Sequence, residues 1–455
     1  MTVEPARDQA ADSLDVAARV VELTEARAPG ADVEVTVRTG TAALTRFANS
    51  FIHQNVAEAV SHVLVRVAVD GGVAAASSDG PLDAETLGRL ADGVVEAARV
   101  RPPDPDWPGL APPSDAPDPG RWDEATAGAE PEERARRVAD FVAAADGLET
   151  AGACRSEGVV TAFASSAGQR LAGRATAAGI DGIARTGTAD GSGRAASARI
   201  ADLDGGAVGA VAAGKARAAS DPTELPPGRY EVVLEPQCVA DILLVLFVAG
   251  FNGRAVEEGR SFLRIGEAQF DRSITLSEDP TDPGQVGIGF DVEGTPKRRL
   301  EVVRDGVTLA PIHTRRTAAR AGVASTGHAI EAAEGWGALP TNPVLAAGER
   351  TTADLVAEVD RGLLVTDFWY TRILDPRTQV VTGLTRNGVW LIEGGQAVRP
   401  VTNLRFTQSY LDALAPGAVL GVGSQRALVF GGFGASFLVP SLRLASWSFT
   451  GGAKG

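Results

Sequence analysis

Three side chains in the second half of the sequence could take part in acid–base chemistry. Asp291 and Glu293 are two positions apart, so on a strand their carboxylates would share one face and could form a pair. A simpler interpretation is a charged strand edge that pairs with Arg298 or Arg299. His328 follows Ser-Thr-Gly in a turn-like run, where it could line a cavity or simply bond the backbone of its turn. These alternatives stay open at the level of sequence.

The common nucleophilic and nucleotide-binding motifs are absent. There is no Gly-x-Ser-x-Gly elbow, and neither Cys154 nor Cys238 has a histidine nearby in sequence. Both cysteines have apolar neighbours, so we expect buried thiols and no disulfide framework. The run from Gly209 to Lys215 has the spacing of a phosphate-binding loop, but Ala216 occupies the position of the magnesium-binding hydroxyl. This run therefore indicates an alanine-rich helix.

One apolar stretch is the expected centre of the C-terminal half. Residues 230–234 predict a strand, and Pro236 then begins a helix. From Val239 to Ala249 the only charged residue is Asp241, so this helix should have no solvent face and should run through a core. The helix is too short to cross a bilayer. It contains no histidine and no glutamate, and therefore offers neither a pair of metal ligands nor a general base.

Length and charge limit the classes of protein to which this chain can belong. The 455 residues should form two or three domains with an ample core. The formal net charge of −15 disfavours binding to nucleic acid through its phosphates. Neither a charged-then-apolar leader nor a run of about 18 apolar residues is present. We therefore expect a soluble, cytoplasmic protein that binds neither nucleic acid nor a membrane.

A proline-rich segment marks the main boundary in the chain. Residues 101–120 are rich in proline and aspartate, which suits an extended linker and excludes a helix interior or a central strand. Residues 1–100 predict an N-terminal α-β-β-β-α domain, residues 121–225 a middle α+β domain, and residues 226–455 a β-rich C-terminal domain. The expected fold class is α+β, with N-terminal α/β-sandwich layers followed by a large bent antiparallel β-sheet domain around the buried helix.

Several motifs, in order along almost the whole chain, resemble those of the TldD/PmbA family, once called modulators of DNA gyrase. The strongest lie in the C-terminal domain, and weaker ones occur in the first two domains. They are Phe290–Gly294, Arg304–Val307, Ser325–Ala329, Gly362–Thr366, Asn387–Trp390, Thr45–Ser50 and Ser165–Gly168.

The resemblance implies one of two kinds of subunit. TldD-type chains of this family are zinc peptidases with a His-Glu-x-x-x-His helix and a distant cysteine as third ligand, whereas TldE/PmbA-type chains lack these ligands and pair with a TldD-type chain. Here the expected helix at 239–249 has no such ligands, and residues 429–432 read Val-Phe-Gly-Gly where the cysteine would precede a glycine. The chain therefore resembles the TldE/PmbA kind, with no cofactor of its own and zinc expected in the partner subunit.

The resemblance also implies a function. We expect a non-catalytic subunit of a zinc-dependent peptidase or amide hydrolase, which encloses a chamber for a peptide or a small amide as a heterodimer with a TldD-like partner, and which forms a homodimer when alone. Asn252 and Arg254 follow the helix directly, so they join Asp291, Glu293 and His328 as candidates for substrate binding.

Two alternatives belong to other functional classes. One is a stand-alone homodimeric binding or scaffold protein without hydrolytic activity, and the other is a self-sufficient enzyme that uses other residues. A neighbouring reading frame that encodes a His-Glu-x-x-x-His chain would favour the heterodimer over the stand-alone protein.

Overall fold

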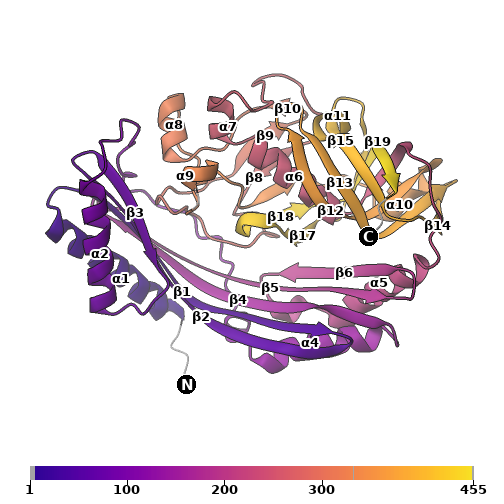
Figure 1. Cartoon of the computed structure of the whole chain (residues 1–455), viewed down its shortest axis with the longest axis horizontal. Helices are drawn as coiled ribbons and strands as arrows, with labels where there is room; N and C mark the ends of the chain where they lie inside the picture. Colours follow the sequence, from indigo (N-terminus) through magenta and orange to yellow (C-terminus); the bar gives the residue numbers. More distant parts are fainter. Residues whose placement is uncertain (1–5, 332, 453–455) are drawn as a thin grey trace.

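The computed structural model describes residues 6–331 and 333–452, which form two stacked layers (Figure 1). The N-terminal half builds one six-stranded antiparallel sheet in the order β3-β2-β1-β4-β5-β6, and the C-terminal half covers one face of this sheet. The strands are β1 (Asp32–Ala48), β2 (Phe51–Val69), β3 (Gly72–Ser78), β4 (Glu149–Ser165), β5 (Arg170–Arg185) and β6 (Asp190–Ser197).

Helices cover the opposite face of the sheet (Figure 1). The side chains of Asp83 and Asp204 cap the first turns of α2 and α5, and Pro131 lies in the first turn of α4, where its missing N–H costs nothing. The helices of this half are α1 (Ala6–Arg27), α2 (Ala84–Arg99), α3 (Glu124–Ala127), α4 (Pro131–Ala144) and α5 (Gly205–Ala218), with a 3-10 turn η1 (Ile200–Asp202).

The alternation of side chains along β1 explains this layering. Val33, Val35 and Val37 are fully buried against α1 and α2. Because successive side chains of a strand point to opposite faces, Thr36 and Arg38 face the C-terminal half instead. One face of the sheet is thus a hydrophobic core, and the other is free to line a cavity.

The C-terminal half contains two further sheets. Pairing of β12 with both β7 and β13 closes five strands of the larger sheet, β12-β7-β19-β15-β13, into a ring, with β14 beside β13 and β16 beside β19. These strands are β7 (Gly228–Leu234), β12 (Arg361–Asp375), β13 (Val380–Glu393), β14 (Gln396–Pro400), β15 (Leu404–Ser409), β16 (Val419–Val422) and β19 (Leu442–Gly452).

The second sheet has the order β10-β9-β8-β11-β18-β17. Its strands are β8 (Leu276–Glu278), β9 (Leu300–Arg304), β10 (Val307–Thr308), β11 (Pro343–Leu345), β17 (Ala427–Phe430) and β18 (Ser436–Val439). The remaining short elements are α7 (Gly253–Glu257), α8 (Arg315–Ala321), α9 (Ala333–Trp336), α10 (Thr352–Ala357), α11 (Tyr410–Leu414) and the 3-10 turn η2 (Gly432–Gly434).

The buried helix predicted from the sequence is α6 (Pro236–Ala249). It contacts strands of both C-terminal sheets, and Val239, Ile242, Leu246 and Phe247 on it are fully buried. The prediction of a core helix and the α+β fold class are confirmed. The single bent sheet expected around this helix is instead divided into two, each of which includes one parallel strand pair. No helix within the described ranges is long and apolar enough to span a bilayer.

The first and middle segments of the chain share one sheet. Strands β1 and β4 pair from Glu34 with Ser165 to Phe47 with Gly152, so the regions 1–100 and 121–225 meet along a continuous ladder. The proline-rich segment between them contains no helix or strand. Its Trp107 docks on the layer below, where the indole nitrogen donates to the carboxylate of Asp32 at 2.7 Å.

Candidate functional site

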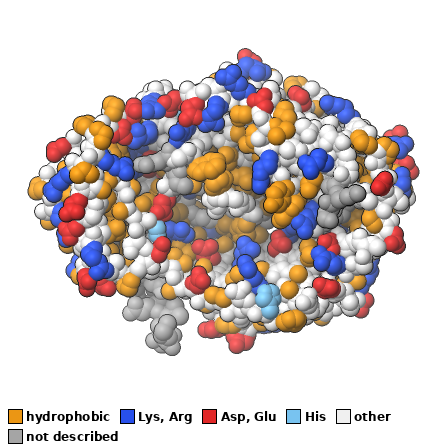
Figure 2. Space-filling model, viewed as in Figure 1, with side chains coloured by type: hydrophobic (Ala, Val, Ile, Leu, Met, Phe, Trp, Pro, Cys, Tyr) orange, Lys and Arg blue, Asp and Glu red, His pale blue; other side chains and the backbone are white. Residues whose placement is uncertain are grey.

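A cavity of about 1030 Å³, the chamber, separates the long sheet from the C-terminal half. Figure 2 shows the molecule hollowed between these two layers. Side chains of β1, β2, β4 and β5 form the floor of the chamber, and loops of the C-terminal half form its roof. The roof residues are Val286–Ile288, Phe290–Val292, Lys297, Ala329–Glu331, Thr341, Asn342, Phe430, Gly431 and Phe433–Ser436.

The floor carries both apolar and charged side chains. Leu44, Val56 and Val159 are among the apolar side chains that line it. Among its charged side chains, Nη2 of Arg38 on β1 lies 3.6 Å from Oε1 of Glu157 on β4. A smaller cavity of about 550 Å³ adjoins the chamber and shares part of its lining, including Thr36, Leu64 and Ala329–Glu331.

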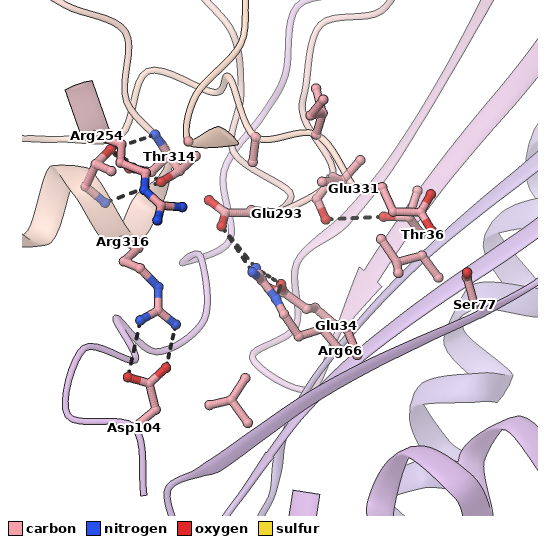
Figure 3. Close-up of a pocket in the computed structure, with 18 of the residues that line it drawn as sticks. Glu34, Thr36, Arg66, Ser77, Asp104, Arg254, Glu293, Thr314, Arg316 and Glu331 are labelled. Atoms are coloured by element: carbon pink, nitrogen blue, oxygen red, sulfur yellow. Dashed lines mark hydrogen bonds and ion pairs between the residues drawn. The ribbon is translucent and has the colours of Figure 1, made fainter. Parts of the chain in front are cut away.

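A buried network of charges joins the floor to the roof beside the smaller cavity (Figure 3). Arg66 of β2 ion-pairs with Glu34 of β1 and reaches Glu293 of the C-terminal half at 3.2 Å. Arg315, the first residue of α8, donates from Nη1 to Glu34 at 2.9 Å and from its backbone N–H to Glu293 at 2.8 Å. Burial raises the pKa of Glu34 above its ordinary value, although Arg66 and Arg315 oppose this effect.

The linker adds an aromatic contact to this network. The ring of Trp107 lies 5.1 Å from the guanidinium carbon of Arg66 and 5.7 Å from that of Arg315. Nearby, Arg316 donates to Asp104 of the linker at 3.2 Å, as Figure 3 shows. Sheet, linker and C-terminal half are therefore joined by charges at one place.

Asp291 lies in the roof loop, and its carboxylate is surrounded by backbone N–H groups. It accepts hydrogen bonds from the N–H groups of Glu293 at 3.0 Å, Thr295 at 2.9 Å and Ala329 at 2.9 Å. Burial, with a further contribution from the charge of Glu293, raises the pKa of Asp291 to about 7. The N–H groups of Ala329 and Thr295 and the charge of Lys297 lower this pKa but do not outweigh burial. Asp291 thus titrates near neutral pH at the chamber wall.

The alternative in which Asp291 and Glu293 form a charged strand edge with Arg298 or Arg299 is wrong. The segment Asp291–Thr295 is a turn rather than a strand, so its side chains do not alternate. Glu293 instead pairs with Arg66, whereas Arg299 lies near Asp279 and Glu301.

Two other predicted site residues lie behind the walls of these cavities. His328 is 1 % exposed and lines neither cavity; its Nδ1 bonds Thr326 at 2.8 Å, and its Nε2 lies 3.2 Å from Glu278 outside hydrogen-bonding geometry. Asn252 caps α7 through its Oδ1, while its Nδ2 donates to the carbonyls of Val248 and Trp336. The amide of Asn252 is thus fully engaged in holding the chain that follows α6.

Arg254 lines the smaller cavity, which also contains Glu293. Its Nε donates at 2.8 Å to the carboxylate of Glu258, the residue that directly follows α7. The structure therefore places Arg254 and Glu293 at the smaller cavity and Asp291 at the adjoining chamber, and places Asn252 and His328 outside both.

Lys297 was missed by reasoning from the sequence. Its side chain is 6 % exposed and lines the chamber roof. Burial lowers the pKa of this ammonium group, although Asp291 and Glu278 act against that effect. The available signal was composition, since Lys215, Lys297 and Lys454 are the only lysines among 43 basic residues.

The donors on α6 do not fit a zinc ion. Asp241 accepts hydrogen bonds from Thr371 at 2.8 Å and Tyr410 at 3.0 Å, and burial raises its pKa to about 6. The thiol of Cys238 is fully buried and faces the carbonyl of Val365. Neither side chain lines the chamber, and among the described residues there is no cluster of three or more His, Cys, Asp or Glu side chains suited to a metal.

Comparison with known proteins agrees with this architecture. Residues 227–451 match the family described as the PmbA/TldA metallopeptidase C-terminal domain. The chain belongs to the TldD/PmbA family. Over its whole length it is similar in fold to TldE from Thermococcus kodakarensis, with a TM-score of 0.86, 18 % identity, and coverage of 96 % of this chain and 100 % of that one.

Curated relatives of this TldD/PmbA chain are distant. A metalloprotease of Methanothermobacter thermautotrophicus is 26 % identical over 227 residues, which is 46 % of this chain and 46 % of that protein. A metalloprotease TldD homolog of Buchnera aphidicola is 24 % identical over 204 residues, 43 % of this chain and 41 % of that protein. The chain thus spans less than half the length of each of these relatives.

Proposed function

We propose that this chain is a non-catalytic TldE/PmbA-like subunit that forms a substrate chamber with a TldD-like, zinc-bearing partner in a peptidase or amide hydrolase. One observation carries the proposal: the chain has a large chamber but offers no zinc ligands on α6, the helix whose counterpart holds the metal in TldD-type chains. Hydrolysis then needs a metal from another chain. We place the complex in the cytoplasm.

The size and lining of the chamber suit a short peptide or a comparable amide. Ligand pockets commonly measure about 300–1,000 Å³, and the chamber lies at the upper end of this range. The apolar side chains of its floor would contact side chains of the substrate, while Asp291 and the charged floor residues would contact its polar groups. This chain binds and orients in the proposed complex, and the partner supplies the metal-activated water.

Exposed aromatic side chains support association with another subunit. Trp369 and Tyr370 on β12 are 47 % and 64 % exposed. Phe433, at the chamber, is 44 % exposed, and its ring lies 5.3 Å from that of Trp336. Large apolar side chains in such positions are typical of interaction surfaces. We propose a heterodimer with the TldD-like chain and a homodimer when the chain is alone.

The test is reconstitution with a TldD-like chain encoded in the same genome. Light scattering should report a heterodimer, elemental analysis about one zinc per complex, and peptide hydrolysis should require both chains. Replacement of the glutamate in the partner's His-Glu-x-x-x-His motif should abolish hydrolysis. Stoichiometric zinc or hydrolysis in the isolated chain would refute the proposal.

A further inference from the structure

Lys297 lies buried at the chamber, and no group in the described part of the chain contacts its ammonium directly. Within residues 6–331 and 333–452, no hydrogen bond or ion pair joins its ammonium group to another side chain or carbonyl. The other described lysine, Lys215, shows the usual arrangement, with its Nζ 2.5 Å from Glu235. A buried charge without a hydrogen-bonding partner costs free energy, so its retention needs a reason.

The backbone around Lys297 holds the side chain in place. The N–H of Lys297 donates to the carbonyl of Gly289 at 2.7 Å, and Phe290 and Pro296 form a β-bridge that closes the loop. The aliphatic stem passes the backbone of Gly327, where a Cβ atom would lie 3.1 Å from Cγ of Lys297. The ammonium group is therefore presented to the chamber from a rigid loop.

The two carboxylates whose charges act on Lys297 are already hydrogen-bonded to backbone N–H groups. Asp291 is held by three backbone N–H groups, as described above. Glu278 accepts from the N–H groups of Thr341 at 3.1 Å and Asn342 at 2.8 Å. Both carboxylates favour the charged ammonium through space, but neither neutralises it by direct contact.

We propose that Lys297 is the carboxylate-recognition residue of the chamber, pairing with a carboxylate of a bound peptide. The inference rests on the proposed function, because it assigns a binding role within that chamber. The carboxylate can come from the C-terminus of the peptide or from an acidic side chain. A dianionic phosphate fits less well, since Asp291 and Glu278 already place acidic groups near the ammonium.

Four tetrapeptides that carry an uncharged BODIPY dye at the N-terminus test the proposal and separate the two sources. They are Ala-Val-Glu-Ala and Ala-Val-Gln-Ala, each with a free or an amidated C-terminus. Fluorescence anisotropy gives their affinities for the chain alone and for its complex with the TldD-like partner. The variants are Lys297→Met, which keeps the stem, Lys297→Arg, which keeps the charge, and Lys215→Met as a control that removes a lysine outside the chamber.

We expect Lys297→Met to weaken binding of the peptides that bear the recognised carboxylate by about tenfold or more. The affinity for the amidated glutamine peptide should stay unchanged. Dependence on the free C-terminus identifies that source, and dependence on glutamate identifies the side chain. Lys297→Arg should retain most of the preference, and Lys215→Met all of it. Because Lys297→Met removes an unpaired buried charge, its Tm should not fall, so lost binding cannot be ascribed to unfolding.

An equal effect of Lys297→Met on all four peptides, or no effect, would overturn this inference and leave the proposed function standing. Inorganic phosphate that competes better than acetate would also overturn the carboxylate assignment. If neither the chain nor the complex binds any of the four peptides, both the inference and the proposed chamber function fail.

Discussion

Helix α6 and the roof of the chamber are both largely buried, yet they differ in whether their charged side chains have direct partners. On α6 the one acid, Asp241, is held by two hydroxyl groups, and the neighbouring side chains of the helix pack into the apolar core. In the roof loop and the turn beside it, Asp291, Glu293 and Lys297 lie within seven residues, and the ammonium of Lys297 has no direct partner in the described chain. The core helix thus serves stability, whereas the roof keeps charges that would be costly without a ligand.

The largest effect should come from the charges that join the layers. Arg315→Met should destabilise the fold by about 3–5 kcal/mol, because Glu34 would remain buried with one fewer cation. Urea unfolding measures this change. Arg316→Met is the matched control, since its pair with Asp104 is more exposed and should contribute only about 0–1 kcal/mol. Equal losses for the two variants would contradict a structural role for the buried network.

Truncation of a buried side chain on α6 should show that this helix stabilises the fold by filling volume in the core. Leu246 is fully buried, so Leu246→Ala should lose about 2–5 kcal/mol through the cavity that it leaves. Leu244 on the same helix is only half-buried, and Leu244→Ala should therefore lose less. Thermal melts and urea unfolding of both variants check the difference. In a reconstituted complex, peptide turnover should fall only in proportion to the folded fraction, and a larger fall would give α6 a role beyond packing.

Asp291 should make stability depend on pH in the direction opposite to an ordinary salt-bridged acid. Its folded pKa of about 7 lies above the ordinary value of 3.8, so the cost of its charge is fully present above pH 7. As the pH falls from about 7 to 4, the folded state takes up a proton and this cost is relieved. The wild type should gain stability relative to Asp291→Asn over this window, by on the order of a few kcal/mol. A constant difference in stability between the two proteins from pH 4 to 7 would show that the pKa of Asp291 is not raised.

The smallest effect on stability is expected for Arg254, which lines the smaller cavity and is half-exposed. Arg254→Ala should leave the Tm nearly unchanged but lower peptide turnover in the complex, if this side chain guides substrate. Asn252→Ala is the informative comparison, because it removes the cap of α7 and should lower the Tm by the equivalent of about 1 kcal/mol. Unchanged turnover for Arg254→Ala would leave this loop with a structural role only.

The sequence by itself determined the features that depend on local pattern. The unbroken apolar run predicted α6 as a core helix, alternating valines predicted β1, and the prolines of residues 101–120 excluded regular structure. Each of these follows from periodicity or from backbone chemistry within a short window. The missing zinc ligands on α6 were visible in the same way, as were the motifs of the TldD/PmbA family.

Only the tertiary structure decided which distant segments meet. The ladder between β1 and β4 joins residues more than a hundred positions apart, and Arg66 finds Glu293 across the two layers. Nothing local in the sequence distinguishes that partner from the neighbouring Arg298 or Arg299. Burial is likewise a property of the whole fold, so the sequence could not show that His328 lies behind the wall while Lys297 reaches the chamber. Charge and residue type are local, but desolvation and pairing depend on how the layers pack.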